Sequence, residues 1–378
     1  MKRIKIFGIW MVVLLLFLAV GCSNGGTDPG NGDDNGDGNN GNGDDVLLTV
    51  EELFSMENDV RYVYEGSGNE YASFYTVVDY LEGNKIQRRT DNGGTQTVEV
   101  IQVDTGVVER LYRKGEVYFR ENLLKKTDVR EVLLMEPIEV GTQWTVSGDG
   151  TRTITGIDVE VETPLGIFDT VEVTTEFQQQ DAYSMFSLVQ GNYDTAITED
   201  AAAEYSGVIK EYYAKDIGLV KRAYVMAEGE VVSELKEIIE DDKLVQSVIF
   251  YYPDQSSQDY DEYQQVVKEV SFATNQVTRT TLEEAYKEDA PFTVLTENTT
   301  INHLYLNDDG MVYIDVSKAF VDEMNLGAGY ESMVLQALAN TIGNYYGLER
   351  ILLTVDNGLY ESGHIVLQQG EYLEADLE

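Results

Sequence analysis

The chain has 378 residues, and its 68 acidic and 26 basic side chains give a formal net charge of −42 at pH 7. This balance disfavours nucleic acid and anionic lipid headgroups as direct partners, because phosphate binding needs clustered lysine and arginine. The length allows two or more folded domains, and a single cysteine excludes an internal disulfide or a cysteine-based zinc site.

The first residues have the pattern of an export signal. Basic residues are followed by fifteen uncharged residues at 6–20, which is short for a membrane span of about 20 residues and typical of a signal-peptide core. Ala19 and Gly21 place small residues just before Cys22, and this arrangement resembles the bacterial lipobox. Residues 1–21 are therefore predicted to be a lipoprotein signal peptide, with Cys22 as the lipid attachment site. An ordinary secretory peptide with an incidental cysteine is the alternative.

Residues 22–45 are predicted to be the lipid-anchored cysteine and a disordered Gly/Asn/Asp tether. No apolar residue occurs from 23 to 45, so this segment cannot bury a core. A GxGxxG match at 36–41 has no preceding strand or following helix, and a calcium-loop match that begins at Asp33 has no flanking helices. Composition explains both matches, so no metal or cofactor is expected here.

Residues 46–240 are predicted to form an all-β extracytoplasmic domain. Short runs of β-branched and aromatic residues end at Gly, Asn or Asp, from "DVRYVYEG" to "EVYFRE" at 116–121, and residues 97–103 alternate with period two. This spacing predicts an antiparallel meander, in the form of a curved sheet or half-barrel. Residues 178–207 interrupt the pattern and read as an inserted loop, with a helical turn possible at 200–204.

Part of this region, residues 131–225, resembles a β-rich segment of bacterial surface lipoproteins. The resemblance rests on Gly141 and Trp144, on "TPLGIF" at 163–168 and on "YAKDIGLVK" at 213–221.

The C-terminal region changes pattern after the charged junction 237–243. Strands are predicted at 247–252 and 266–272, followed by a helix at 281–288 capped by Thr280 or Thr281.

A β-hairpin is predicted at 301–316 around the turn residues 307–310. In it, Leu304 and Leu306 are expected on one face and Val312, Ile314 and Val316 on another.

Three elements complete the predicted order. Ser317 is predicted to be the N-cap of a short helix. A longer helix at 330–346 is expected to stop at Gly347, and a strand follows at 350–355. Strands feeding one sheet, with helices on one face, make an α+β layer.

The order of motifs in residues 245–372 resembles the sporulation and germination GerMN domain. The matching stretches are "YPD" at 252–254, "DGMVYIDVSKAF" at 309–320, "NTI" at 340–342, "VDNG" at 355–358 and "GHIVL" at 363–367. Two stretches, "LEEAYKEDAPF" and "LQQGEY", depart from the family pattern.

The GerMN resemblance implies a small α+β domain of the ring-building type at 245–378, which makes the chain α+β overall. It also implies a non-enzymatic role outside the cytoplasmic membrane of spore-forming, Gram-positive bacteria. The candidate interaction or structural residues within the motifs are Asp315, Ser317, Asn340, Asp356, Gly363 and His364.

The sequence offers little for catalysis. His303 and His364 are the two histidines, and HExxH and GxSxG are both absent. His303 is expected at a sheet edge or in solvent, and His364 in a hydrogen-bonded turn. The predicted function is protein–protein assembly in the cell envelope, in sporulation or germination. Its partners would be the membrane, through the anchor, and envelope or sporulation proteins, self-assembly included. The alternatives are a surface lipoprotein that binds a ligand in a concave β-sheet, or a cell-wall hydrolase.

Overall fold

A computed structural model describes residues 48–146, 150–176, 207–226 and 229–377, all of which belong to one compact unit. The predicted signal peptide, Cys22, the tether and all but the last residue of the inserted loop 178–207 lie outside these residues. Within the described ranges, no helix is both long and apolar enough to cross a membrane.

The first part of the described chain is one twelve-stranded antiparallel sheet. Its strands are β1 (Arg61–Ser67), β2 (Phe74–Glu82), β3 (Lys85–Asp91), β4 (Gln96–Asp104), β5 (Val107–Lys114), β6 (Glu131–Met135), β7 (Gln143–Val146), β8 (Gly150–Glu162), β9 (Ile167–Glu176), β10 (Gly207–Ala214), β11 (Gly218–Met226) and β12 (Gly229–Ile239). The spatial order runs from β6 back to β1, continues with β12, and runs back to β7. Two meanders are therefore joined by the pairing of β1 with β12, and the predicted antiparallel β-structure is confirmed.

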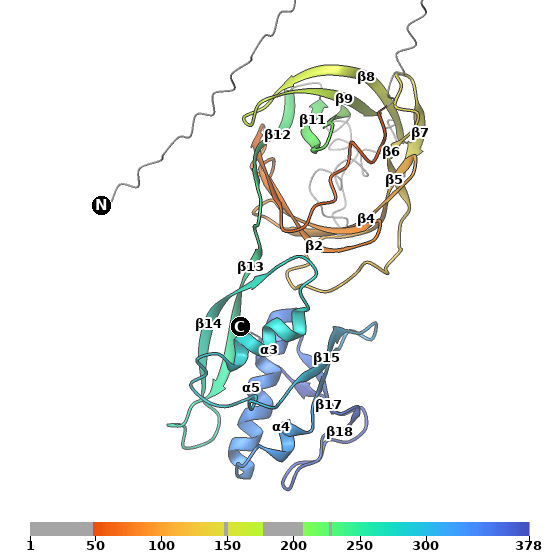
Figure 1. The fold of residues 1–378 in the computed structure, drawn as a ribbon. Helices are drawn as coiled ribbons and strands as arrows, with labels where there is room; N and C mark the ends of the chain where they lie inside the picture. The colour runs from red at the N-terminus through yellow and green to blue at the C-terminus, as the bar shows by residue number, and fades with distance from the viewer. Residues whose placement is uncertain (1–47, 147–149, 177–206, 227–228, 378) are drawn as a thin grey trace, which may run out of the picture. The chain divides into compact units, whose positions relative to one another are not determined.

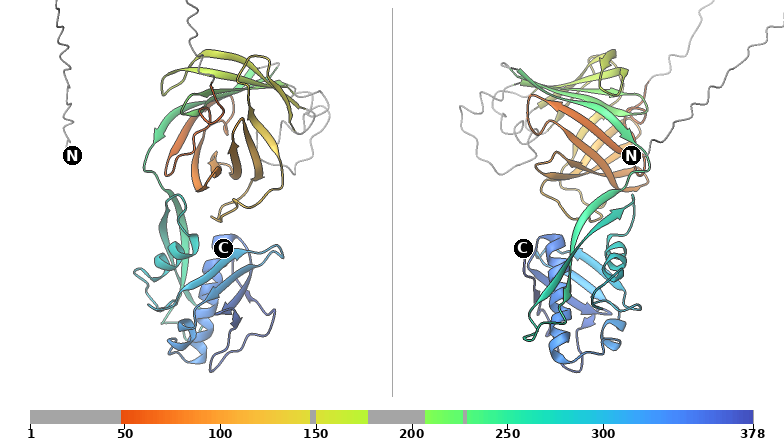
Figure 2. Two further views of the ribbon diagram at one scale, coloured as in Figure 1. Left: turned by 45° about the vertical axis from the view of Figure 1, so that its right-hand side comes forward. Right: turned by 90° about the vertical axis from the view of Figure 1, so that its left-hand side faces the viewer.

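The sheet curls almost completely around, further than the predicted half-barrel (Figure 1). Its two end strands are β6 and β7. The Trp144 indole of β7 donates a 2.9 Å hydrogen bond to the Val132 carbonyl of β6, so a side chain bridges the point where strand pairing stops. Figure 2 shows the same curved sheet from two other directions.

Apolar side chains fill part of the sheet's interior. The segment before β1 contributes Val50, Leu53 and Phe54, which are buried in one cluster with Ile86 and Ile154. The residues that precede β1 therefore form part of the core of the large sheet.

The predicted strand at 116–121 is wrong, because this stretch is part of the loop after β5. Its backbone carbonyls are used by a buried guanidinium group: Arg89 donates to the carbonyl oxygens of Val117 and, at 2.8 Å, of Phe119. From the same stretch, the side chain of Val117 is buried in a cluster with Val98 and Leu111.

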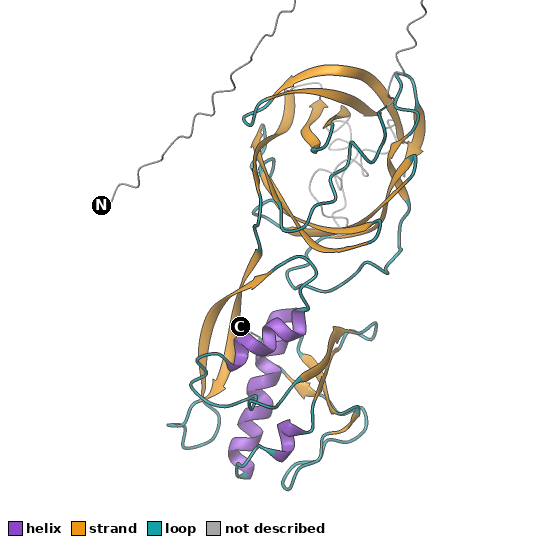
Figure 3. Ribbon diagram, viewed as in Figure 1, coloured by secondary structure: helices purple, strands orange, loops and turns teal. Residues whose placement is uncertain are grey.

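The rest of the chain combines strands and helices. Its elements are β13 (Leu244–Pro253), β14 (Tyr263–Phe272), α3 (Thr278–Lys287), β15 (Ile301–Leu306), β16 (Val312–Val316), α4 (Ala319–Asp322), α5 (Ala328–Tyr346), β17 (Arg350–Val355), β18 (Gly358–Leu359) and β19 (Leu373–Glu374). The described helices all lie in this region (Figure 3). The predicted order of elements is therefore confirmed.

The prediction of a single sheet here is wrong. β13 pairs only with β14 in a two-stranded sheet, and β15, β16, β17 and β18 form a second sheet in which β19 also pairs with β17. The far edge of β13 meets α5, because the Tyr251 amide donates a 2.9 Å hydrogen bond to the Thr341 hydroxyl. A helix thus takes the place that a neighbouring strand would need.

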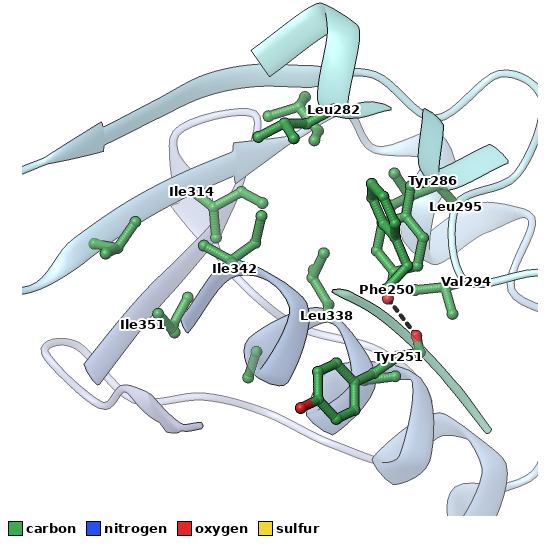
Figure 4. Close-up of a cluster of buried hydrophobic side chains, with 14 of the residues drawn as sticks. Phe250, Tyr251, Leu282, Tyr286, Val294, Leu295, Ile314, Leu338, Ile342 and Ile351 are labelled. Atoms are coloured by element: carbon green, nitrogen blue, oxygen red, sulfur yellow. Dashed lines mark hydrogen bonds between the residues drawn. The ribbon is translucent and has the colours of Figure 1, made fainter. Parts of the chain in front are cut away.

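A shared core holds these layers together (Figure 4). Leu338 and Ile342 of α5 are buried together with Ile314 and Ile351 from the second sheet. The Tyr286 hydroxyl of α3 donates a 2.7 Å hydrogen bond to the Tyr251 carbonyl of β13, which satisfies the polar end of a buried ring.

The structure corrects the predicted faces of the hairpin. Leu304 lies opposite Ile314 and Leu306 lies opposite Val312. Residues directly opposite in an antiparallel pair share a face, so these apolar side chains face the same core instead of opposite sides.

The start of α3 also differs from the prediction. The helix begins at Thr278 and its N-cap is Val277, with no side-chain cap. Thr281 lies inside the helix, where its hydroxyl donates to the Val277 carbonyl at 3.2 Å.

Candidate functional site

β16 and β17 run parallel and are connected through α4 and α5. The carboxyl ends of parallel strands meet at one edge of a sheet, where ligand-binding side chains commonly lie. Asp315 and Ser317 lie at the end of β16, and Asp356 directly follows β17. Three of the sequence-predicted residues are therefore brought to one edge.

Asp315 is the buried centre of this edge, with 3% of its surface exposed. Its carboxylate accepts hydrogen bonds from the Thr354 hydroxyl at 2.6 Å, the Asn357 amide at 2.7 Å and the Asn302 side chain at 2.9 Å. Burial alone would raise the pKa of Asp315, but these donors outweigh it and leave the pKa lowered. A carboxylate saturated in this way holds the loop after β17.

The prediction that Ser317 caps a helix is wrong. The N-cap of α4 is Lys318 and has no side-chain cap of its own. The Ser317 hydroxyl instead accepts the Thr300 amide at 2.9 Å, while Asp356 accepts the Lys318 amide at 3.2 Å. The carboxylate from the neighbouring parallel strand thus takes the role predicted for the serine.

Asn340 is buried on α5, where its side-chain oxygen accepts the Gln336 amide at 2.7 Å and the Asp376 backbone amide at 2.9 Å. It joins the helix to the C-terminal segment.

Gly363 and His364 lie exposed in the loop after β18. The His364 amide donates to the Ser362 hydroxyl at 3.0 Å, as expected for a turn histidine. Within the part of the chain that the structure describes, the hydrogen bonds of these two residues involve neither Asp315 nor Asp356, so the predicted residues serve different places in the fold.

Sequence reasoning missed Arg120, which is 1% exposed and makes several hydrogen bonds to distant parts of the chain. Its guanidinium donates to the Tyr80 hydroxyl at 2.9 Å and to the backbone carbonyls of Asp79 at 2.6 Å and Ala273 at 3.0 Å, and it also bonds Gln276 and Thr278. Its own amide donates to the Tyr345 hydroxyl at 3.0 Å. One arginine therefore ties the large sheet to the segment between β14 and α3 and to the end of α5.

Asp79 supplies the matching negative charge and is fully buried. It lies 3.0 Å from the Arg89 guanidinium and 3.8 Å from Arg120. Charges this deeply buried require pairing, because desolvation of an isolated ion is costly. In the sequence, Arg88 and Arg89 are adjacent within a predicted strand. This pattern alone does not show that an arginine is buried.

A cleft of about 580 Å³ lies beside this arginine. Its lining includes Glu121 from the loop after β5, Val277 and Arg279 at the start of α3, and three consecutive residues of β15, His303, Leu304 and Tyr305. We call it the β15 cleft. Burial raises the pKa of Glu121, and His303 is exposed on the edge strand as predicted.

Arginines also gather inside the large sheet. Glu211 of β10 lies 2.8 Å from Arg222 and pairs with Arg152, while Glu99 of β4 lies 2.8 Å from Arg110. The field of Arg222 reaches Glu99 across strands that are not neighbours, so these side chains converge in the interior.

The comparisons agree with the resemblance found in the C-terminal region. The family model described as "Germane: Sporulation and spore germination" matches residues 249–361. The matched segment runs from β13 to just beyond β18 and lies within the predicted 245–372. The GerMN-type resemblance of this segment is thereby confirmed. A search of curated proteins found no match.

Three similar solved structures were found. A presumed lipoprotein from Clostridium perfringens is 17% identical, covers 35% of this chain and 93% of its own, and has a TM-score of 0.21. A presumed exported protein with a YmcC-like fold from Bacteroides fragilis is 13% identical, covers 50% and 98%, and has a TM-score of 0.25. A presumed lipoprotein from Parabacteroides distasonis is 12% identical, with the same coverages and a TM-score of 0.23.

Proposed function

We propose that this protein is a lipid-anchored, extracytoplasmic lipoprotein that acts without catalysis in protein–protein assembly in the cell envelope, during sporulation or germination. The observation that carries the proposal is the Germane match to residues 249–361. The lipobox-like residues before Cys22 and the apolar run at 6–20 support the anchored location.

The described contacts connect the large sheet to the C-terminal region, which supports a role in which the two act together. Arg120 bonds the large sheet and the Germane segment (residues 249–361) through the same guanidinium group, so the two parts are in direct contact. We also propose that residues 245–378 form a domain of the ring-building type.

Gene deletion in the native host tests the function. We expect the deletion strain, and a strain with the chain truncated after Glu240, to lose heat-resistant spores or their germination. Normal spores that germinate normally in both strains would contradict the proposal. A Cys22→Ser strain tests the anchor, since the protein should leave the membrane fraction.

The proposal of a non-enzymatic role has its own test. His303 and His364 both lie exposed, and no hydrogen bond of either imidazole occurs within the residues that the structure describes. We expect His364→Ala to leave sporulation and germination unchanged. Loss of function with a correctly folded, correctly located variant would favour a hydrolase.

The interior arginines favour a second candidate function, binding of an anionic ligand inside the curved sheet. Among the described residues that converge there, five arginines meet three glutamates: Arg88, Arg110, Arg113, Arg152, Arg222, Glu99, Glu131 and Glu211. A positive interior in so acidic a chain suits an anion. A rise in melting temperature with phosphate, absent with chloride at equal ionic strength, would support this candidate.

A further inference from the structure

We propose that the free edge of β15 binds an extended peptide segment of another protein, which adds a strand to the second sheet inside the β15 cleft. This inference rests on the proposed assembly function and gives that function a contact surface. An exposed strand edge is a template for pairing with another chain.

The backbone of β15 defines which groups face the cleft. Its single strand partner in the described structure is β16. The Asn307 amide donates to the Met311 carbonyl at 3.0 Å, so the bonds toward β16 come from alternate residues 303, 305 and 307. The amides of Leu304 and Leu306 therefore point away from β16.

Both ends of this edge are already occupied. At one end, the Ile301 amide donates to Glu283 at 2.7 Å and the Ile301 carbonyl accepts from Arg279 at 2.8 Å. At the other end, the backbone of Leu306 hydrogen-bonds the Glu121 carboxyl. Side chains that cap strand edges prevent unwanted pairing, and here they do so only at the two ends of β15.

The middle of the edge is open. Leu304 carries the outward amide and carbonyl between the two capped ends, and within the described ranges no hydrogen bond to this backbone occurs on the outward side. The cleft is lined by three consecutive residues of β15, 303–305. Side chains of consecutive strand residues point to opposite faces, so a cavity that touches all three lies along the edge and not on one face.

The lining indicates the kind of segment that fits. The β15 cleft has a volume of about 580 Å³, which lies within the range of about 300–1,000 Å³ that is usual for binding pockets. Val277, which also lines the cleft, is 49% exposed, and Tyr305 is 41% exposed and stacks on Tyr313 with ring centroids 5.4 Å apart. These surfaces suit an extended segment with apolar side chains, whose main chain would pair with Leu304.

Site-specific photo-crosslinking in the native host tests the surface. The full-length protein would carry p-benzoylphenylalanine in place of Tyr305, and in a matched control in place of Tyr372, which is similarly exposed at 43%. Both replacements keep an exposed aromatic ring, so folding should be unaffected. We expect a crosslinked product from position 305 that is absent from position 372, and its crosslinked peptide would be sequenced.

The main chain of the captured segment is then probed directly. A synthetic peptide with the captured sequence would be titrated onto the full-length protein in detergent, alongside two copies N-methylated at adjacent residues. Strand addition predicts that one N-methylation weakens binding at least about tenfold and the adjacent one does not, because successive amides point to opposite edges.

Several outcomes would overturn the inference: equal products from both positions, a crosslink to a second copy of this chain, or a peptide indifferent to N-methylation at either residue. The proposed function fails separately. If truncation after Glu240 abolishes sporulation but position 305 captures nothing, assembly stands and the β15 edge is not its surface.

Discussion

Single buried carboxylates give the clearest predictions at the residue scale. Glu211 is enclosed by Arg152 and Arg222, and the Tyr213 hydroxyl donates to it at 3.2 Å. Burial alone would raise the pKa of Glu211, but the two arginines outweigh it and lower the pKa to about 2. The charged form is therefore stabilised by folding.

This lowered pKa makes stability depend on pH with a defined sign. Because the folded-state pKa lies below the unfolded value of 4.5, the contribution is fully present above pH 4.5 and is lost as the pH falls toward 2. We expect Glu211→Gln to lower the free energy of unfolding by about 3 kcal/mol at pH 7. Urea denaturation should show the difference from the parent protein shrinking below pH 4.5.

A surface glutamate provides the control for Glu211. Glu65 pairs with Lys236 at 3.0 Å, but both side chains are about half exposed. Glu65→Gln should change the free energy of unfolding by less than about 1 kcal/mol at any pH. A pH-independent loss in Glu211→Gln would show that the carboxylate is not preferentially charged in the folded protein.

The sequence predicted where the motif residues lie better than it predicted which groups they hydrogen-bond. Asp315 and Ser317 belong to one GerMN-like motif and Asp356 to another, and all three lie at one sheet edge. Which oxygen accepts the Lys318 amide could not be read from the sequence, because Asp356 reaches it only through the parallel pairing of β16 and β17. Local helix-cap rules do not include such a distant acceptor.

At the element scale, the end of α5 gives a separable prediction. Gly347 is the C-cap residue in the left-handed conformation, with φ at 67°. A side chain there is strained although nothing lies within 4 Å of the added Cβ. Gly347→Ala should cost about 1 kcal/mol in unfolding free energy, measured by chemical denaturation.

Gly363 is the matched control, since its φ is not positive and an added Cβ again meets nothing within 4 Å. Gly363→Ala should be neutral within about 0.5 kcal/mol. Equal losses in the two variants would mean that backbone conformation is not the cause.

Elements with strong local signals were predictable, and those decided by distant contacts were not. The helix at 330–346 and its stop at Gly347 follow from apolar spacing and a C-terminal glycine, and the structure has α5 at Ala328–Tyr346. Residues 116–121 are rich in β-branched and aromatic side chains, as a strand would be, yet Arg89 bonds the carbonyls that a strand partner would need. Tertiary hydrogen bonds overrode the pattern.

At the scale of the whole molecule, Arg120 joins the large sheet to the Germane segment. Arg120→Met would leave the carbonyls of Asp79 and Ala273 without their donor and remove a positive charge near buried Asp79. We expect a loss of about 3–5 kcal/mol in unfolding free energy. Arg120→Lys should recover part of it, because an ammonium group keeps the charge but not the planar fork of donors.

The control for Arg120 is Arg130, which is 67% exposed and lies 3.7 Å from Glu109. Arg130→Met should be within about 0.5 kcal/mol of the parent protein. If Arg120→Met unfolds in the same single transition at an unchanged midpoint, the arginine does not hold the two parts together.

The closure of the large sheet was beyond sequence reasoning. Alternation and turn residues predicted antiparallel neighbours along the chain, which is what the two meanders are. The pairing of β1 with β12 joins segments far apart in sequence, with Tyr64 opposite Leu235, and no local pattern encodes it. The curvature that brings β6 beside β7 depends on this pairing.

The excess of acidic residues makes a last prediction for the whole molecule. A net charge of −42 opposes the compact state through self-repulsion, and salt screens such repulsion between exposed charges over about 10 Å or less. The interior pairs around Glu211 and Asp79 are screened much less because they are buried. The melting temperature at pH 7 should therefore rise by several degrees from low to molar sodium chloride.

Acidification separates screening from other effects of salt. Near the sequence isoelectric point of about 4.1, the net charge vanishes and screening has little repulsion to remove, so the rise in melting temperature should largely disappear. A rise of equal size at both pH values would instead indicate that salt acts through apolar burial. A flat or falling curve at pH 7 would mean that attractive surface pairs outweigh the repulsion between the acidic side chains.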